Sequence, residues 1–195
     1  MKPRASYTPE QLLAKYRALR AEITDQEFFR SPKHKKTQEM WCAAHFACAF
    51  DRYLDRCDIL IDDIDAHTDA DFDLHVNGVS YAFQITEVLE PERRRGDEYR
   101  NGVPSVRADD WSRGSQFGPS WVRAALEKKL LKKYARAETL NLLAYLNFGA
   151  WQQQYVDIRS ECATCRSTLH QFGYSTETPC VAFNRVRCSK HSRDG

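Results

Sequence analysis

The sequence contains no apolar run long enough to span a bilayer, and no apolar block follows the charged residues near its N-terminus. These absences argue against an integral membrane protein and against secretion, so we expect a cytoplasmic protein without a membrane partner. Internal repeats and low-complexity tracts are also missing. The 195 residues, of which 42% are apolar, suffice for one folded domain with a short appendage.

A disulfide framework is also not indicated. The chain has seven cysteines, an odd number, and in a protein without an export signal these are more often free thiols or metal ligands. Cys162-Ala-Thr-Cys165 and Cys188-Ser-Lys-His191 have the spacing of a structural zinc site. The alternative is that Cys162 and Cys165 lie on one face of a helix and fill a core as small apolar residues.

Charge is nearly balanced overall, at +2, but it is unevenly distributed. Residues 51–73 contain nine aspartates against two arginines, a local balance of −7. Residues 121–136 contain six basic residues against one glutamate, a local balance of +5. An acidic centre with basic flanks suits a metal site that receives a polyanion.

Helix and strand signals divide the chain into two parts. Thr8-Pro9-Glu10-Gln11 is a capping box, from which we expect a helix to about Glu27 and then a basic linker, so that residues 1–36 form the first part. Residues 37–195 form the main domain, in which Thr37 would cap a second helix that ends near Asp55. The other expected elements are a strand at 57–64, a hairpin at 69–88, a long connection at 91–117, a helix at 118–137 and a strand at 140–148, which complete the core (37–148), and a helix at 155–172 and a strand at 179–188 in the C-terminal segment (151–190).

Asn77-Gly78 is the strongest hairpin signal, because both positions of a type I′ turn need a positive φ. With a two-residue loop, Leu74 pairs with Tyr81 and Asp71 pairs with Gln84. Side chains alternate across a strand, so one face of the hairpin is apolar. The opposite face carries mostly polar residues, namely Asp69, Asp71, Asp73, His75, Ser80, Gln84 and Thr86.

Two interpretations account for this polar face. An antiparallel sheet often exposes one face to water, which would make the acidic residues a solvated surface. However, the face has no lysine or arginine, and crowded like charges cost stability unless a cation lies among them. Carboxylate and amide oxygens suit Mg²⁺ or Mn²⁺. We therefore predict a Mg²⁺ or Mn²⁺ site with Asp71, Asp73 and Gln84 as ligands, and with Glu87 as a further ligand if a bulge turns it toward the ion.

The order of elements between residues 37 and 148 adds a second argument. A helix with Glu39 (TQEMW) is followed by an ADFDL strand, a tight turn, an FQITEV strand, a basic helix and an apolar strand. This order resembles the PD-(D/E)XK nuclease superfamily, and especially its small bacterial and phage members with an arginine-rich loop, here ERRRGDEY. The resemblance implies a restriction-endonuclease-like α/β (α+β) fold, with a mixed central sheet flanked by helices, and metal-dependent hydrolysis of phosphodiester bonds.

The resemblance also assigns roles to individual positions. Asp71 matches the aspartate of the PD motif, although Ala70 replaces the proline, and Gln84 takes the place of the second acid, as in some branches. Glu39 matches an acid that many members carry on the first core helix. Thr86 falls where the superfamily has a lysine, whose ammonium orients the nucleophile and offsets charge in the transition state. A threonine brings no positive charge.

A lysine from another element would supply the missing charge. Lys129 and Lys133 are the candidates, since they lie four residues apart beside the apolar stripe of the expected basic helix. The alternative is that they belong to a solvated basic face.

Basic residues around the acidic centre would bind the phosphates of nucleic acid. Residues 91–113, however, contain six basic and five acidic side chains. Ion pairs within this loop therefore explain its arginines as well as phosphate binding does. The residues expected to bind phosphates are Arg93, Arg94, Arg95, Lys128 and Lys132.

These features together predict a Mg²⁺- or Mn²⁺-dependent nuclease that acts on DNA, and many nucleases of this type cut two strands as homodimers. The alternative is a protein with the same fold that lacks catalysis and binds nucleic acid or a protein partner, with zinc stabilising it. The predicted catalytic residues are Asp71, Gln84, Thr86, Glu39, Lys129 and Lys133.

Overall fold

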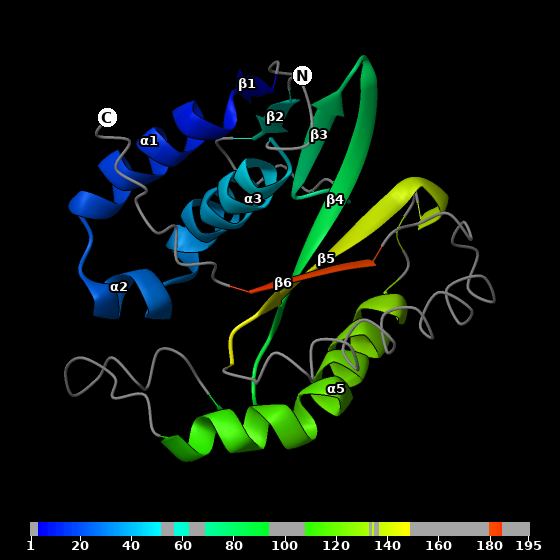
Figure 1. The fold of residues 1–195 in the computed structure, drawn as a ribbon. Helices are drawn as coiled ribbons and strands as arrows, with labels where there is room; N and C mark the ends of the chain where they lie inside the picture. The colour runs from blue at the N-terminus through cyan, green and yellow to red at the C-terminus, as the bar shows by residue number, and fades with distance from the viewer. Residues whose placement is uncertain are drawn as a thin grey trace, which may run out of the picture.

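The computed structural model describes residues 4–51, 57–62, 69–93, 108–132, 134, 137–148 and 180–184. Its centre is a six-stranded mixed sheet in which strands follow one another in sequence order (Figure 1). The strands are β1 (Ala5–Tyr7), β2 (Cys57–Ile61), β3 (Phe72–Val76), β4 (Val79–Val88), β5 (Leu140–Leu146) and β6 (Cys180–Asn184). β1 to β4 pair antiparallel, whereas β4 with β5 and β5 with β6 pair parallel.

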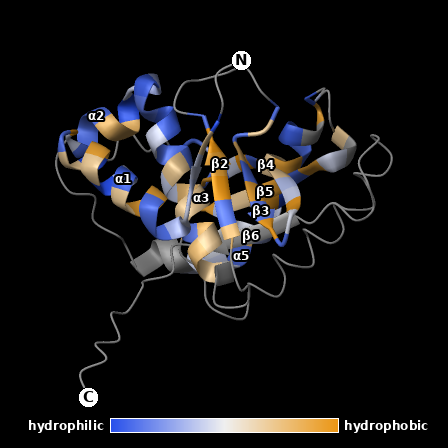
Figure 2. Ribbon diagram, turned by 90° about the horizontal axis from the view of Figure 1, so that it is seen from above, coloured by the Kyte–Doolittle hydropathy of each residue, from blue (hydrophilic) through white to orange (hydrophobic). Residues whose placement is uncertain are grey.

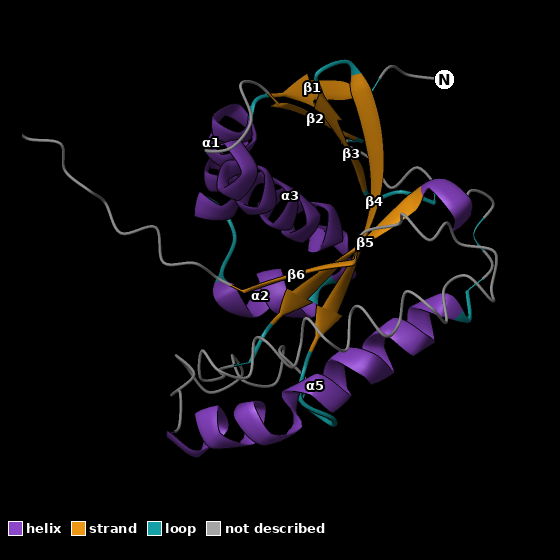
Figure 3. Cartoon of the chain, turned by 45° about the vertical axis from the view of Figure 1, so that its right-hand side comes forward, coloured by secondary structure: helices purple, strands orange, loops and turns teal. Residues whose placement is uncertain are grey.

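Helices cover both faces of this sheet. They are α1 (Pro9–Ala21), α2 (Asp25–Arg30), α3 (Lys35–Asp51) and α5 (Ala108–Leu130), with short 3₁₀ turns η1 (Pro32–His34) and η2 (Ala137–Thr139). α1 and α3 lie on one side of the sheet and α5 lies on the other (Figure 3). The predicted α+β class, with a mixed sheet flanked by helices, is confirmed. None of the described helices is long and apolar enough to cross a bilayer.

Strand alternation divides the core into two main clusters. On the α3 side, Phe72 and Phe83 stack at 5.0 Å between ring centroids, and Phe46 of α3 packs edge-on against both. On the α5 side, Leu142 and other alternate residues of β5 pack against α5. Hydrophilic and hydrophobic stretches alternate along α1 and α2 (Figure 2), as expected for helices that have one face on the core.

The N-terminal part belongs to this same core. β1 pairs with β2, and Leu12 of α1 is fully buried among residues of α3 and the sheet. The described residues before position 37 therefore pack against the expected main domain.

The predicted capping box of α1 is confirmed. The Gln11 backbone N–H donates to Thr8 Oγ1 at 3.3 Å, and the Thr8 N–H donates to Gln11 Oε1 at 3.0 Å. The expected end near Glu27 is wrong, because α1 stops at Ala21 and Thr24 caps the separate helix α2. Thr24 competes for backbone N–H groups in the way that favours a new helix start.

The start of α3 also differs from the prediction. Pro32 begins a 3₁₀ turn that leads directly into α3 at Lys35. Thr37, expected to be the cap, is instead buried inside the first turns of the helix with 8% of its surface exposed.

The helix expected at 118–137 starts ten residues earlier and ends at Leu130, so the expected connection at 91–117 is wrong from Ala108 onward. Gly118 and Pro119, at the expected start of this helix, lie inside α5. At Gly118 the helix comes so close to Phe148 that an added Cβ would lie 2.6 Å from Phe148 Cε2. This glycine reflects a close helix–sheet contact.

The predicted hairpin is confirmed in turn and register. Asn77 and Gly78 have φ values of 50° and 79°, and Leu74 pairs with Tyr81 and Phe72 with Phe83. β5 and β6 confirm the strands expected around 140–148 and 179–188, although only Cys180–Asn184 of the latter is described. The expected helix at 155–172 and the zinc candidates Cys162, Cys165, Cys188 and His191 lie outside the described residues.

Candidate active site

The site lies where the sheet divides. β4 pairs with β3 through residues 79–83 and with β5 through residues 82–88, so only Ala82 and Phe83 have both neighbours. Asp71 immediately precedes β3 at this point. Its backbone N–H donates to the Phe83 carbonyl at 2.8 Å, and its Oδ2 accepts from the Ile85 N–H at 2.7 Å. The carboxylate thus replaces the strand neighbour that Ile85 has lost, and this bond fixes its direction.

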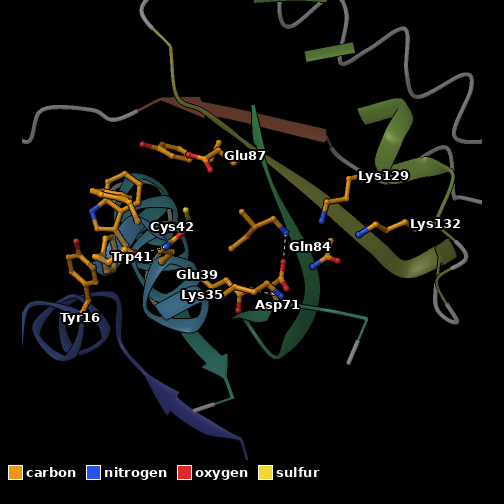
Figure 4. A pocket seen from close by; sticks show the side chains of 15 residues that line it. Tyr16, Lys35, Glu39, Trp41, Cys42, Asp71, Gln84, Glu87, Lys129 and Lys132 are labelled. Atoms are coloured by element: carbon orange, nitrogen blue, oxygen red, sulfur yellow. Dashed lines mark hydrogen bonds and ion pairs between the residues drawn. The ribbon is translucent and has the colours of Figure 1, made fainter. Parts of the chain in front are cut away.

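A cavity of about 320 Å³ opens beside Asp71. Asp71 and Gln84 line it and expose only 7% and 9% of their surfaces. Figure 4 shows that Lys129 and Lys132 point toward Gln84 from the α5 side, while Glu39 and Lys35 lie beside Asp71 on the α3 side. The polar end of the cavity, as we call it below, consists of Lys35, Glu39, Asp71, Gln84, Lys129 and Lys132.

Glu39 is held within this end by two neighbours on its own helix. Lys35 Nζ lies 3.2 Å from Glu39 Oε1, and Lys36 Nζ lies 2.8 Å from Oε2. The pKa of Glu39 is nevertheless raised, first by burial and then by the negative charge of Asp71. The two carboxyl groups therefore repel each other, and a further positive charge at this place would stabilise both.

Lys129 supplies an ammonium group from the last turn of α5. Burial lowers its pKa, and the nearby charge of Asp71 acts in the opposite direction. The apolar stripe of α5 places Leu126 in the core. Lys129 follows about one helical turn later and lines the cavity. Its partner in the prediction, Lys133, lies outside the described residues.

The donor set at the polar end fits a hard divalent cation. The carboxyl groups of Asp71 and Glu39 and the amide oxygen of Gln84 are oxygen ligands of the kind that Mg²⁺ and Mn²⁺ prefer. In the described part of the chain, no three side chains of histidine, cysteine, aspartate or glutamate are placed to hold a metal together. A cation here would therefore depend on Gln84 and on water as well as on the two carboxylates.

Asp73, expected to complete the ligand set, lies elsewhere. Its carboxylate is bound by the Arg4 guanidinium, whose Nε also lies 3.2 Å from Asp62 Oδ2. The register explains this, because Asp73 pairs with Leu60 of β2, which pairs in turn with Ser6 of β1, two residues after Arg4. An arginine far away in sequence therefore supplies the positive charge that the polar face of the hairpin lacks.

Two other predicted residues of β4 are placed differently from Asp71 and Gln84. Thr86 is buried, at 7% exposure, and does not line the cavity. Glu87 lines the cavity and accepts a hydrogen bond from Asn147 Nδ2 at 2.9 Å. It faces the α3 side without a bulge, as alternation after Ile85 requires.

The predicted phosphate-binding residues do not lie together. Lys132 lines the cavity, whereas Lys128 is exposed and does not line it. Arg93 donates to the Asn147 carbonyl at 2.9 Å. Arg94 and Arg95 lie outside the described residues.

Sequence reasoning missed the opposite end of the cavity. The aromatic end, as we call it, consists of Tyr16, Phe28, Phe29, Trp41 and Tyr145, which come from α1, α2, α3 and β5. No local pattern joins residues so far apart in the sequence. Lys35 was also missed, although its position four residues before Glu39 is a recognisable helical pairing signal.

Comparison with known proteins adds no further constraint on this site. No family model, curated protein or solved structure matches the chain. The chemistry of the cavity is therefore the basis for assigning a function.

Proposed function

We propose that the protein is a metal-dependent nuclease with a restriction-endonuclease-like fold that hydrolyses phosphodiester bonds in DNA. One observation carries the proposal. Asp71, Glu39, Gln84 and Lys129, which belong to different parts of the fold, line one cavity at the point where the sheet divides. Two carboxyl groups, an amide and an ammonium group are the groups that such hydrolysis needs.

The charges around the cavity support a phosphate as the substrate group. Lys35, Lys129 and Lys132 bring three positive charges to its polar end, and two of them come from the region of α5. Positive side chains hold phosphates and orient them. The ammonium of Lys129 would offset the negative charge that develops on the phosphate oxygens in the transition state, a role that Thr86 cannot fill.

Asp71, Glu39 and Gln84 would hold Mg²⁺ or Mn²⁺. When bound, such an ion polarises the phosphate and lowers the pKa of a bound water. The raised pKa of Glu39 supports this assignment, because a cation would relieve its repulsion from Asp71. Asp71 keeps its orientation through the Ile85 N–H, so its carboxylate is prearranged for this task.

Calorimetric titration with Mn²⁺ tests the proposal. Asp71→Asn keeps the shape of the side chain and an acceptor for the Ile85 N–H but removes the charge, so we expect it to weaken Mn²⁺ binding by more than the roughly 10- to 100-fold typical of outer-shell changes. Asp73→Asn is the matched control, since its carboxylate is engaged by Arg4, and it should bind Mn²⁺ like the wild type. Plasmid cleavage in Mg²⁺ should follow the same order.

Absence of Mn²⁺ binding to the wild type, or unchanged binding by Asp71→Asn, would refute the metal site. A second candidate function is then favoured by one observation. Lys35 and Lys36 already contact both oxygens of Glu39, so the chain itself balances this acid. A protein that binds nucleic acid without cutting it would show tight DNA binding that a chelator does not change.

A further inference from the structure

The aromatic end of the cavity is a preformed apolar surface. The ring centroid of Trp41 lies 5.1 Å from that of Tyr145 at 70° between planes, and the rings of Phe28 and Phe29 lie 4.8 Å apart at 76°. Each pair has the edge-to-face geometry that aromatic side chains prefer, so the rings hold one another in place. Trp41 is only partly buried, which leaves part of its surface toward the cavity.

One fixed polar group lies among these rings. Gln38 lines the cavity, and its Nε2 donates to the Phe28 carbonyl at 2.8 Å. This bond fixes the plane of the Gln38 amide. The carbonyl oxygen Oε1 keeps the capacity to accept a hydrogen bond from a ligand. Apolar walls with a few convergent polar groups are typical of sites for small organic groups.

The polar and aromatic ends are parts of the same cavity, and this continuity suggests its occupant. A ligand that fills both ends carries an anionic group for Lys35, Lys129 and Lys132 and a flat apolar group for Trp41 and Tyr145. A free phosphate would leave the aromatic walls without a contact. A purely apolar ligand would make no use of the positive charges at the polar end, where Lys35 contacts Glu39 and where Lys129 and Lys132 also lie.

We propose that the aromatic end receives the base of the nucleotide whose phosphate lies at the polar end, so that the substrate is nucleic acid with an unpaired base at the position of cleavage. This inference rests on the proposed function and deepens it. The volume of about 320 Å³ is near the lower limit for small-molecule sites, which suits one nucleotide and excludes a base pair. A base enters such a pocket only from a single strand or after extrusion from a duplex.

Calorimetry with two small phosphates tests the base site directly. We expect dAMP to bind about tenfold more tightly than 2-deoxyribose 5-phosphate in the presence of Ca²⁺, the gain that one stacked base typically gives. Trp41→Ala and Tyr16→Ala should each reduce this preference to less than about threefold, whereas Trp41→Phe should retain most of it because the ring remains. Phe117→Ala, an exposed aromatic residue of α5 outside the cavity, is the control and should keep the full preference.

Equal binding of the two phosphates by the wild type would overturn the inference. So would a preference that survives in both alanine variants, once circular dichroism has shown that they are folded. The result also separates the two proposals. A Trp41-dependent preference for dAMP without any cleavage would overturn the proposed nuclease activity and leave the base site intact. Cleavage together with equal binding of the two phosphates would support the nuclease activity and overturn the base site.

Oligonucleotide cleavage then distinguishes the two sources of an unpaired base. Cleavage confined to single strands would show that the substrate is a strand that is already unpaired. Cleavage of a duplex at a single mismatch would show that the base is extruded from a duplex, since a mismatched base costs least to unstack. Equal cleavage of a single strand and of a fully matched duplex would contradict the requirement for an unpaired base.

Discussion

Asp71 and Glu39 share one cavity but are supported in different ways. A main-chain N–H fixes Asp71, whereas Glu39 is contacted by two lysines and is less acidic than an ordinary glutamate because of burial and of Asp71 itself. Because its pKa is raised, Glu39 is the carboxyl group of the pair that gains a proton more readily than an ordinary glutamate. At the scale of single residues this asymmetry is the main chemical property of the site.

Lys129 allows a prediction about pH. If its ammonium offsets charge on the phosphate, Lys129→Met should reduce the cleavage rate roughly 100- to 1,000-fold. Because burial lowers the pKa of Lys129, the wild-type rate should fall as pH rises through a value below the ordinary range of lysine. Lys129→Arg keeps its charge there, so its rate should not show this alkaline fall. Steady-state rates on a labelled oligonucleotide at neutral and alkaline pH are the measurement.

Lys128→Met is the matched control, because Lys128 lies on the same helix but is exposed and outside the cavity. It should cleave at close to the wild-type rate at every pH. An identical alkaline fall in the wild type and in Lys129→Arg would show that another group titrates.

Sequence reasoning reached part of this residue-level arrangement. The alternation of β3 and β4 predicts that Asp71 and Gln84 lie on the same side of the hairpin, and helical spacing makes Lys129 a neighbour of the core stripe. It failed for Asp73, since the Arg4 that binds it is 69 residues distant and only the sheet brings the two together. It failed for the aromatic end for the same reason.

At the scale of single elements, α5 shows how local signals mislead. Glycine and proline ordinarily mark the boundary of a helix, and here both lie within one. The close contact of Gly118 with Phe148 is the overriding cause, together with the packing of Trp121 edge-on against Phe148 at 5.2 Å. Helix propensity scales contain no information on tertiary contacts of this kind.

Gly118→Ala is the test of this contact. Alanine favours a helix interior by about 1 kcal/mol over glycine. We nevertheless expect net destabilisation, because the new Cβ would overlap Phe148, and overpacking of this kind costs roughly 1–3 kcal/mol. Chemical denaturation followed by circular dichroism measures the free energy of unfolding.

A double-mutant cycle with Phe148→Leu gives the control. The smaller side chain makes room for the Cβ, so Gly118→Ala should cost less, or even stabilise, in the Phe148→Leu background. Strict additivity of the two changes would mean that the contact with Phe148 is not the reason for the glycine.

At the scale of the whole molecule, the N-terminal helices pack on the same core as the sheet. α1 packs on α3, and β1 extends the sheet at its edge. In the sequence, a basic linker separates the first helix from the expected main domain and places the expected boundary at residue 36. In space the same linker lets Lys35 and Lys36 begin α3 beside Glu39.

Leu12→Ala tests this integration. Leu12 is fully buried in the cluster shared with α3, so its truncation should lower the free energy of unfolding by roughly 2–5 kcal/mol. Leu19→Ala, on the same helix but with 39% of Leu19 exposed, should change it by less than about 1 kcal/mol. Tryptophan fluorescence and circular dichroism should report the same midpoint for each variant. Separate midpoints in Leu12→Ala would indicate that α1 unfolds independently.

The division of the sheet at β4 has a mechanical consequence. One block of the molecule, with α1, α3 and the first three strands, carries Glu39 and Asp71, and the opposite block, with α5 and β5, carries Lys129. Within the sheet these blocks are joined by the continuous backbone of β4, which pairs with both neighbours at Ala82 and Phe83, directly before Gln84 and Ile85. A bend of β4 at this point would change the distance between the carboxylate of Asp71 and the ammonium group of Lys129. The spacing of the charged groups along the cavity therefore depends on the shape of this one strand.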